Sequence, residues 1–222
     1  MSIVDKLENL ECLKNGLDKK WIWNNADSFS LSCDYLQKIS YCIQDLNSEI
    51  GSLSNPSMKE VVFVIVLIDW ICEAVDCLPK LLISELRDGF SYECEAELEK
   101  AKKYFKAIRS FVVAHPLTTN RHYDYGFDGD LICVDIGKLS IVVSTFTNDS
   151  DWHHIDFSGL RANAKNENHD FILHVYSQKK NGMKFENYIG ANFSDLFEVA
   201  RTYMKKIYAL DRYLSKQRKK GR

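Results

Sequence analysis

The amino-acid sequence predicts a mainly helical α+β domain, in which an antiparallel helical bundle receives a small antiparallel β-sheet just before a C-terminal helix. Apolar residues recur every three or four positions through the first half of the chain, as they do on the buried face of a helix. Beyond Pro116 the pattern changes to short runs rich in Val, Ile, Phe and Thr, and from Phe193 the helical spacing returns. We therefore expect residues 1–118 to form the bundle, 119–192 the β element, and 193–222 a helix with a basic tail that packs back on the bundle.

Four helices are expected in the bundle. Local signals mark where these helices begin and end. Asn55-Pro56 and the serine at 91, which glutamates follow, are typical of helix starts, and Pro79 is expected to end or kink the helix before it. The first helix is expected to carry Leu7, Leu10, Leu13 and Leu17, and the second to bury Leu36, Ile39, Ile43, Leu46 and Ile50 before Gly51. The third is expected over 58–78, between Asn55-Pro56 and Pro79, and the fourth from Ser91 to His115-Pro116, with Leu98, Ala101, Phe105, Ile108 and Val112 facing inward.

The β element is predicted from β-branched and aromatic runs. Asn181-Gly182 is a hairpin signal, because these two residue types readily adopt positive φ. The expected antiparallel strands are Leu131–Ile136, Leu139–Phe146, Phe171–Tyr176 and Lys184–Ile189, and the last helix carries its apolar stripe from Phe193 to Leu210.

Charge and cysteine content narrow the functional classes. The formal net charge of −2 gives no global basic excess, so any surface that binds phosphate must be local. The seven cysteines include no C-x-x-C pair, which argues against a disulfide framework and a structural zinc site. The N-terminus does not resemble a signal peptide, and the longest apolar run, Val61 to Ile68, is too short to span a membrane. We expect a cytoplasmic protein without a metal, a cofactor or a membrane partner.

Candidate catalytic residues gather where the fourth helix ends. Arg109 and His115 are the expected catalytic pair, and Asn120, Arg121 and His122 follow closely enough to support them. Along an unbroken α-helix six residues turn by about 600°, so the pair would point apart unless the helix ended between them. Pro116 disfavours helical geometry at His115 and supplies that ending.

An arginine and a histidine suit phosphodiester chemistry. The guanidinium offers a fork of charged donors to a phosphate, and imidazole takes or gives a proton near neutral pH. Together they would cleave RNA through the ribose 2′-hydroxyl without a metal. The alternative is that Arg109 bonds carbonyl groups at its helix end and that His115 only caps the helix.

These residues resemble the HEPN superfamily of helical bundles, whose signature is an arginine and a histidine with four to six residues between them. Arg109 and His115 have five, and the resemblance covers about the first 118 residues. It implies a homodimeric, metal-independent endoribonuclease in a toxin or antiviral defence role, with RNA (tRNA or mRNA) as substrate and an antitoxin or regulatory protein as a further partner. Some members carry a tyrosine two residues after the histidine, where this chain has Leu117, so a modification there is not implied.

Two other classes of function remain open. One is a non-catalytic HEPN-like module that binds nucleotide, RNA or a protein, and the other is a structural or antitoxin-like protein whose sheet docks a partner. Three carboxylates of the third helix, Asp69, Glu73 and Asp76, are candidates to hold Arg109, and we favour Glu73.

Three further features are expected to be structural. His153-His154 is interpreted as part of a surface loop or strand rather than a metal site, because neighbouring strand residues face opposite ways. Trp21 and Trp23 are assigned to the core. The basic tail from Lys216 to Arg222 gives little evidence for RNA binding, because such tails are commonly solvated.

Overall fold

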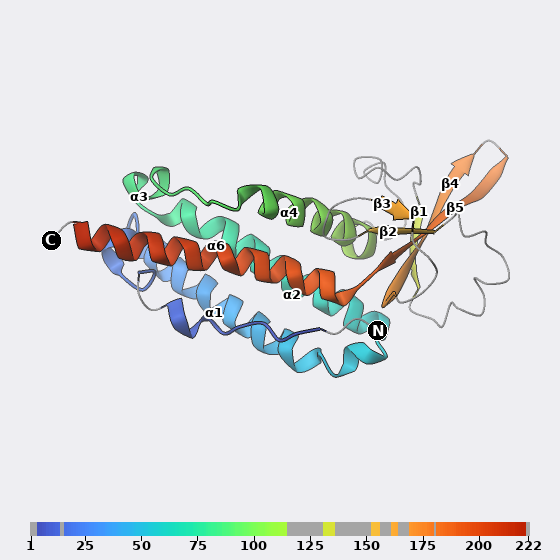
Figure 1. Ribbon diagram of the computed structural model, residues 1–222, viewed down its shortest axis with the longest axis horizontal. Coiled ribbons are helices and arrows are strands. Elements are labelled where there is room, and N and C mark those ends of the chain that lie inside the picture. The colour runs from blue at the N-terminus through green and yellow to red at the C-terminus, as the bar shows by residue number, and fades with distance from the viewer. Residues whose placement is uncertain are drawn as a thin grey trace.

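The computed structural model describes residues 4–13, 16–114, 131–135, 152–155, 161–163, 169–179 and 181–220. Helices pack side by side along the molecule, and a sheet lies at one end of them (Figure 1). The α-helices in this part of the chain are α1 (Ala26–Glu49), α2 (Met58–Cys77), α3 (Ser84–Asp88), α4 (Glu95–Arg109) and α6 (Phe193–Lys220). The strands are β1 (Leu131–Asp135), β2 (Trp152–Ile155), β3 (Arg161–Asn163), β4 (Phe171–Lys179) and β5 (Gly182–Ala191).

The core of the bundle forms around α2, which contacts both α1 and α6, while α4 packs on α6. The prediction of a mainly helical fold with a sheet before the last helix is confirmed. So are the apolar faces: Ile39 and Ile43 of α1 and Phe197 of α6 are fully buried. The C-terminal helix lies along the bundle as expected (Figure 1).

Helix α2 begins at Met58 as predicted, but its cap lies two residues after the Asn55 of the Asn-Pro signal. The cap is Ser57, whose side chain accepts from the Lys59 N–H, and Glu60 accepts in turn from the Ser57 N–H at 2.7 Å. This reciprocal capping box satisfies main-chain donors at the start of the helix. The helix ends at Cys77, and Pro79 lies in the short 3-10 helix that follows, so the predicted ending is confirmed.

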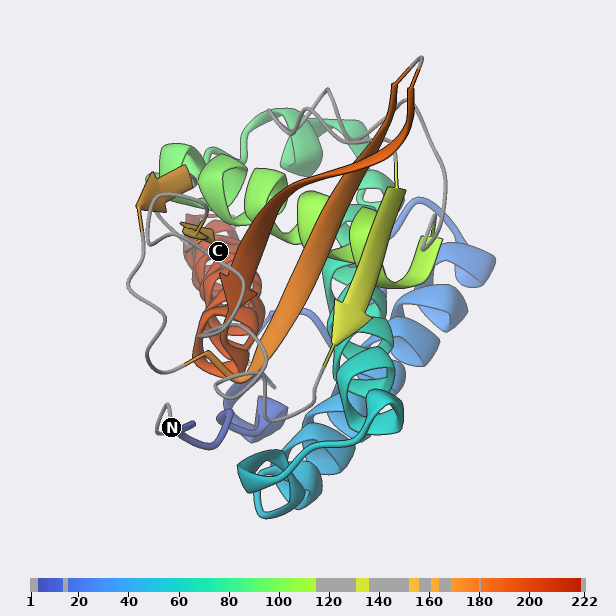
Figure 2. The same cartoon turned by 90° about the vertical axis from the view of Figure 1, so that its right-hand side faces the viewer.

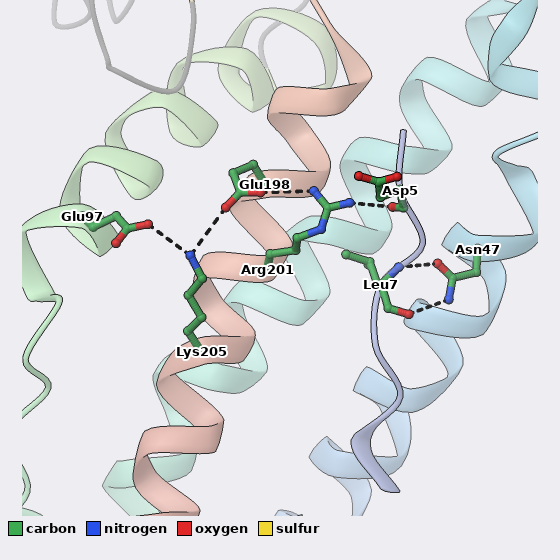
Figure 3. A network of polar contacts seen from close by, with 7 residues as sticks. All are labelled: Asp5, Leu7, Asn47, Glu97, Glu198, Arg201 and Lys205. Atoms are coloured by element: carbon green, nitrogen blue, oxygen red, sulfur yellow. Dashed lines mark hydrogen bonds and ion pairs between the residues drawn. The ribbon is translucent and has the colours of Figure 1, made fainter. Parts of the chain in front are cut away.

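The predicted first helix is wrong. Leu7 is not helical, Leu10–Leu13 form a 3-10 turn, and Leu17 lies in a further turn. The reason is a tertiary contact: the Asn47 side chain of α1 accepts from the Leu7 N–H at 2.8 Å and donates to the Leu7 carbonyl at 2.9 Å (Figure 3). Both main-chain groups are therefore used outside a helix, although Leu7, Leu13 and Leu17 are buried as their spacing indicated.

Charged side chains tie the N-terminal segment and α4 to α6. Lys205 lies between Glu97 and Glu198, with Nζ–O distances of 3.3 and 3.6 Å, and Arg201 links Glu198 to the Asp5 carbonyl (Figure 3). The segment around Asp5 is thus held against α6.

The fourth helix begins later than predicted. Ser91 was expected to open it, but α4 starts at Glu95, with Cys94 at the cap position. The ring of Phe90 packs on Tyr213 of α6 with centroids 5.5 Å apart. This contact fixes the preceding segment against α6 and outside the helix.

The strands form one sheet in the order β1-β4-β5-β2-β3 (Figure 2). Its pairs are antiparallel except for β2 with β5, which is parallel and corrects the all-antiparallel prediction. The connection from β2 to β5 runs through β3 and β4, so the two strands need not reverse direction. Gly182 has φ +107° but pairs with Lys179 as the first residue of β5, so the turn lies one residue earlier than predicted. The expected strand Leu139–Phe146 lies outside the described residues.

Candidate functional site

Arg109 is the last residue of α4, and the chain continues from it as a π-helical turn, Ser110–Ala114. Phe111 and Val112 of this turn are buried, and the turn contacts α2 and β1. Insertions of π geometry in helices occur frequently at functional sites. The bundle and the sheet therefore meet at the π-helical turn that follows Arg109.

The change in helical geometry bears on the predicted catalytic pair. A π-helix bonds residue i to i+5, so the rotation of an α-helix does not apply beyond Arg109. Regular α-helix ends six residues before His115, which is earlier than the proline signal indicated. His115 itself, together with Asn120, Arg121 and His122, lies outside the described residues.

The guanidinium of Arg109 is held by Asp69 of α2. The Arg109 Nε lies 2.7 Å from Asp69 Oδ2, and the two side chains are 40% and 17% exposed. The expectation that Glu73 would be the partner is therefore corrected to Asp69. One of the three predicted carboxylates does hold the arginine, so the joining of α2 to the end of α4 was anticipated.

Helix rotation explains why Asp69 is chosen. Asp69 and Asp76 are seven residues apart and point within about 20° of each other, whereas Glu73 is turned about 40° to the other side of Asp69. Asp76 accordingly contacts Lys102 of α4 at 3.7 Å and Lys206 of α6 at 3.3 Å. Glu73 is exposed and lies near α1. In that position Glu73 is one of the groups that raise the pKa of Tyr35. Burial of Tyr35 has the largest effect, followed by Cys77 and then Glu73.

Burial dominates the electrostatics of Asp69. Loss of solvation raises the pKa of this carboxyl above its usual range, the Arg109 charge opposes the rise, and Glu73 adds to it. An ionised Asp69 therefore depends on Arg109 for compensation. The dependence is unequal, because Arg109 is the more exposed partner and stays charged in any case.

The arrangement leaves Arg109 able to bind an anion. A guanidinium has five N–H donors, and Asp69 engages it at Nε. Within the described part of the chain Arg109 has no ion pair other than that with Asp69, and its side chain is partly exposed. A phosphate can accept two parallel hydrogen bonds from such a fork. Asp69 would meanwhile hold the Arg109 guanidinium in one orientation.

Sequence reasoning missed a basic feature of α4. Lys100, Lys103 and Lys106 are all exposed and lead at intervals of three to Arg109. They line a surface hollow of about 560 Å³, together with Ala96, Glu99 and Lys102. The sequence signal that would have found them is the absence of any acidic residue between Lys100 and Arg109.

The other features of the sequence have the following places. His153 and His154 lie in β2, as the strand alternative required. Trp23 is buried, but Trp21 is 48% exposed, so the assignment of Trp21 to the core is wrong.

Among the described residues no group of three or more His, Cys, Asp or Glu side chains is arranged to hold a metal ion. No helix in the described ranges is long and apolar enough to span a membrane.

Comparison with known proteins adds no further evidence to this geometry. No protein-family model, no curated protein and no solved structure matches the chain. The resemblance to the HEPN superfamily rests on the spacing of Arg109 and His115 and on the helical character of the first half of the sequence.

Proposed function

We propose that the protein is a metal-independent endoribonuclease of HEPN type that acts as a homodimer in a toxin or defence role. The observation that carries the proposal is the Arg109 guanidinium, which Asp69 holds at the junction of bundle and sheet while the arginine side chain stays 40% exposed. This is how a permanently charged group is oriented toward a phosphate. The substrate is RNA.

Cleavage would proceed through the ribose 2′-hydroxyl. The 2′-oxygen forms a bond to phosphorus while the bond from phosphorus to the 5′-oxygen of the next nucleotide breaks. The products are a 2′,3′-cyclic phosphate and a 5′-hydroxyl, and the proton removed from the 2′-hydroxyl is replaced by one given to the leaving oxygen. In this proposal His115 transfers a proton, and Arg109 stabilises charge on the phosphoryl oxygens.

The test is cleavage of a mixed RNA pool in EDTA by the wild type, Arg109→Ala and His115→Ala, with the product ends analysed. We expect cyclic phosphate ends from the wild type and a rate lower by 100-fold or more in both variants, in line with the loss of a single charge-stabilising donor. Arg87→Ala is the matched control, since Arg87 is 45% exposed and pairs with Asp88 at 3.0 Å on α3. Equal cleavage by all four proteins would contradict the proposal.

A second candidate is a non-catalytic module that binds RNA, a nucleotide or a regulatory protein. The ion pair with Asp69 favours it to the same degree, because an oriented guanidinium binds phosphate whether or not the bond breaks. The two differ in the effect of His115→Ala. If the wild type binds RNA through Arg109, leaves it intact and tolerates His115→Ala, the binding module replaces the nuclease.

A further inference from the structure

The exposed basic residues of α4 form a continuous row. Lys100, Lys103, Lys106 and Arg109 recur at every third position. Side chains three residues apart are neighbours on a helix and build a ridge along its surface. Each step advances about 4.5 Å along the axis and turns about 60° around it, so the row covers about 13.5 Å and crosses the exposed face of α4 diagonally, from Lys100 at one edge to Arg109 of the candidate site at the other.

Most other lysines near α4 are neutralised, but the row is not. Lys102 lies near Asp76 and Glu99, and Lys205 and Lys206 of α6 each contact a carboxylate at 3.3 Å. By contrast, Lys100, Lys103 and Lys106 form no ion pair with any residue in the described ranges. Their positive charge is therefore available to a ligand.

The helix dipole does not account for this row. Cations are favoured near a helix C-terminus, but the effect is confined to the last turn. Lys106 and Arg109 lie within or next to that turn, whereas Lys100 and Lys103 lie one to two turns further back. The three lysines are exposed, so no other element of the described structure covers them.

We propose that the row Lys100, Lys103, Lys106 binds the phosphate backbone of single-stranded RNA and leads it to Arg109. The inference rests on the proposed function, since it names how the substrate of that same site is held. Evenly spaced cations suit a polymer with one phosphate at every nucleotide, and backbone contacts of this kind position a strand without reading its sequence.

The experiment measures binding of a fluorescent 2′-O-methyl RNA 12-mer, whose blocked 2′-oxygen prevents cleavage. Wild type is compared with K100Q/K103Q/K106Q over a salt series by fluorescence anisotropy. Glutamine keeps helix propensity close to that of lysine, and a circular dichroism melt checks the fold. The matched control, K20Q/K59Q/K80Q, removes three exposed lysines outside α4 and lowers the charge equally.

We expect the α4 triple variant to bind roughly tenfold or more weakly in 0.1 M salt, and the slope of log K against log salt to be less steep by about 2, as for three lost phosphate contacts. The control triple should bind like the wild type. Equal losses in both triples, no loss in either, or no binding by the wild type would overturn the inference. Competition by poly-glutamate as effective as that by RNA at equal charge would overturn the choice of RNA.

The result is separable from that of the cleavage test. Binding that depends on the row, together with an RNA pool that remains intact, supports the row and contradicts the nuclease. Cleavage that requires Arg109 but is indifferent to the three lysines supports the nuclease and contradicts the row.

Discussion

Asp211 on α6 and Asp69 on α2 both have a pKa that burial raises, but the groups that contact the two carboxylates differ. Asp211 is only 4% exposed and accepts the N–H groups of Gly16 and Leu17 at 2.8 and 3.1 Å. Asp69 instead contacts the long side chain of Arg109, which is 40% exposed.

The difference separates a structural contact from a functional one. At Asp211 every partner is a buried main-chain group that would otherwise lack a hydrogen bond, so the contact stabilises the path of the N-terminal segment. At Asp69 the partner is a side chain that water would solvate if the ion pair were absent, so Arg109 itself gains little stability from the pair. What the Asp69 contact provides is direction for the Arg109 guanidinium.

The largest effect on stability is expected from Asp211→Ala. Two buried N–H groups would lose their acceptor, which lowers the free energy of unfolding by about 3 kcal/mol. Asp211→Asn keeps an acceptor oxygen and is expected to cost less than about 1 kcal/mol. Urea unfolding of the two variants measures both, and equal losses would show that charge rather than hydrogen bonding matters at this position.

Gly16→Ala tests the same contact from the other side. A Cβ at position 16 would lie 2.9 Å from the Asp211 carbonyl oxygen and 2.9 Å from the Leu214 Cβ, neither of which can move alone. We expect a loss of about 2 kcal/mol from overpacking. Gly51→Ala is the control, because nothing lies within 4 Å of its added Cβ and its φ of −64° suits alanine. A melting temperature that is the same for both variants would contradict this close packing.

Asp69→Asn is expected to affect activity more than stability. Loss of the ion pair should lower kcat for RNA cleavage about tenfold because Arg109 is no longer oriented, with KM changed less. The free energy of unfolding should change by less than about 1 kcal/mol. Asp76→Asn is the control, since Asp76 holds Lys102 and Lys206 instead of Arg109. A role of Asp69 in stability alone would be indicated by unfolding losses without a change in kcat.

The smallest expected effect is a pH dependence. The folded-state pKa of Asp211 is raised, so its contribution to stability is fully present below the ordinary aspartate pKa and is lost as pH rises through the raised value. Asp211→Asn removes this titration. The difference in unfolding free energy between wild type and Asp211→Asn should therefore move in favour of the variant as pH rises from about 4 to 7. A difference that is constant with pH would contradict the raised pKa.

Much of the bundle follows from sequence periodicity, because α1, α2, α4 and α6 each have an apolar stripe that is buried. The prediction failed where a distant side chain decides the local structure. Asn47 takes up both main-chain groups of Leu7, and nothing near Leu7 in the sequence indicates this. The parallel pairing of β2 with β5 is likewise a long-range contact that strand propensity does not specify.

The candidate site was predicted to the level of helices but not of partners. Local signals placed the end of this helix at His115-Pro116, whereas the regular α-helix ends at Arg109 and a π-helical turn follows it. The choice of Asp69 over Glu73 depends on which side of α2 faces α4, and two carboxylates four residues apart share a helix face in sequence. The lysine row was missed because its charges were counted only over the whole chain, where they are balanced.

The most direct test of the account measures RNA cleavage and thermal unfolding on the same samples of wild type and Arg109→Ala. If Arg109 works on substrate, the folded variant cleaves RNA 100-fold or more slowly than the wild type, and this loss is far larger than any loss of folded protein that follows from leaving Asp69 without its partner. If Arg109 is instead a structural partner of Asp69, the variant unfolds at a clearly lower temperature, and its remaining folded fraction cleaves RNA as fast as the wild type. That second result would contradict the central claim.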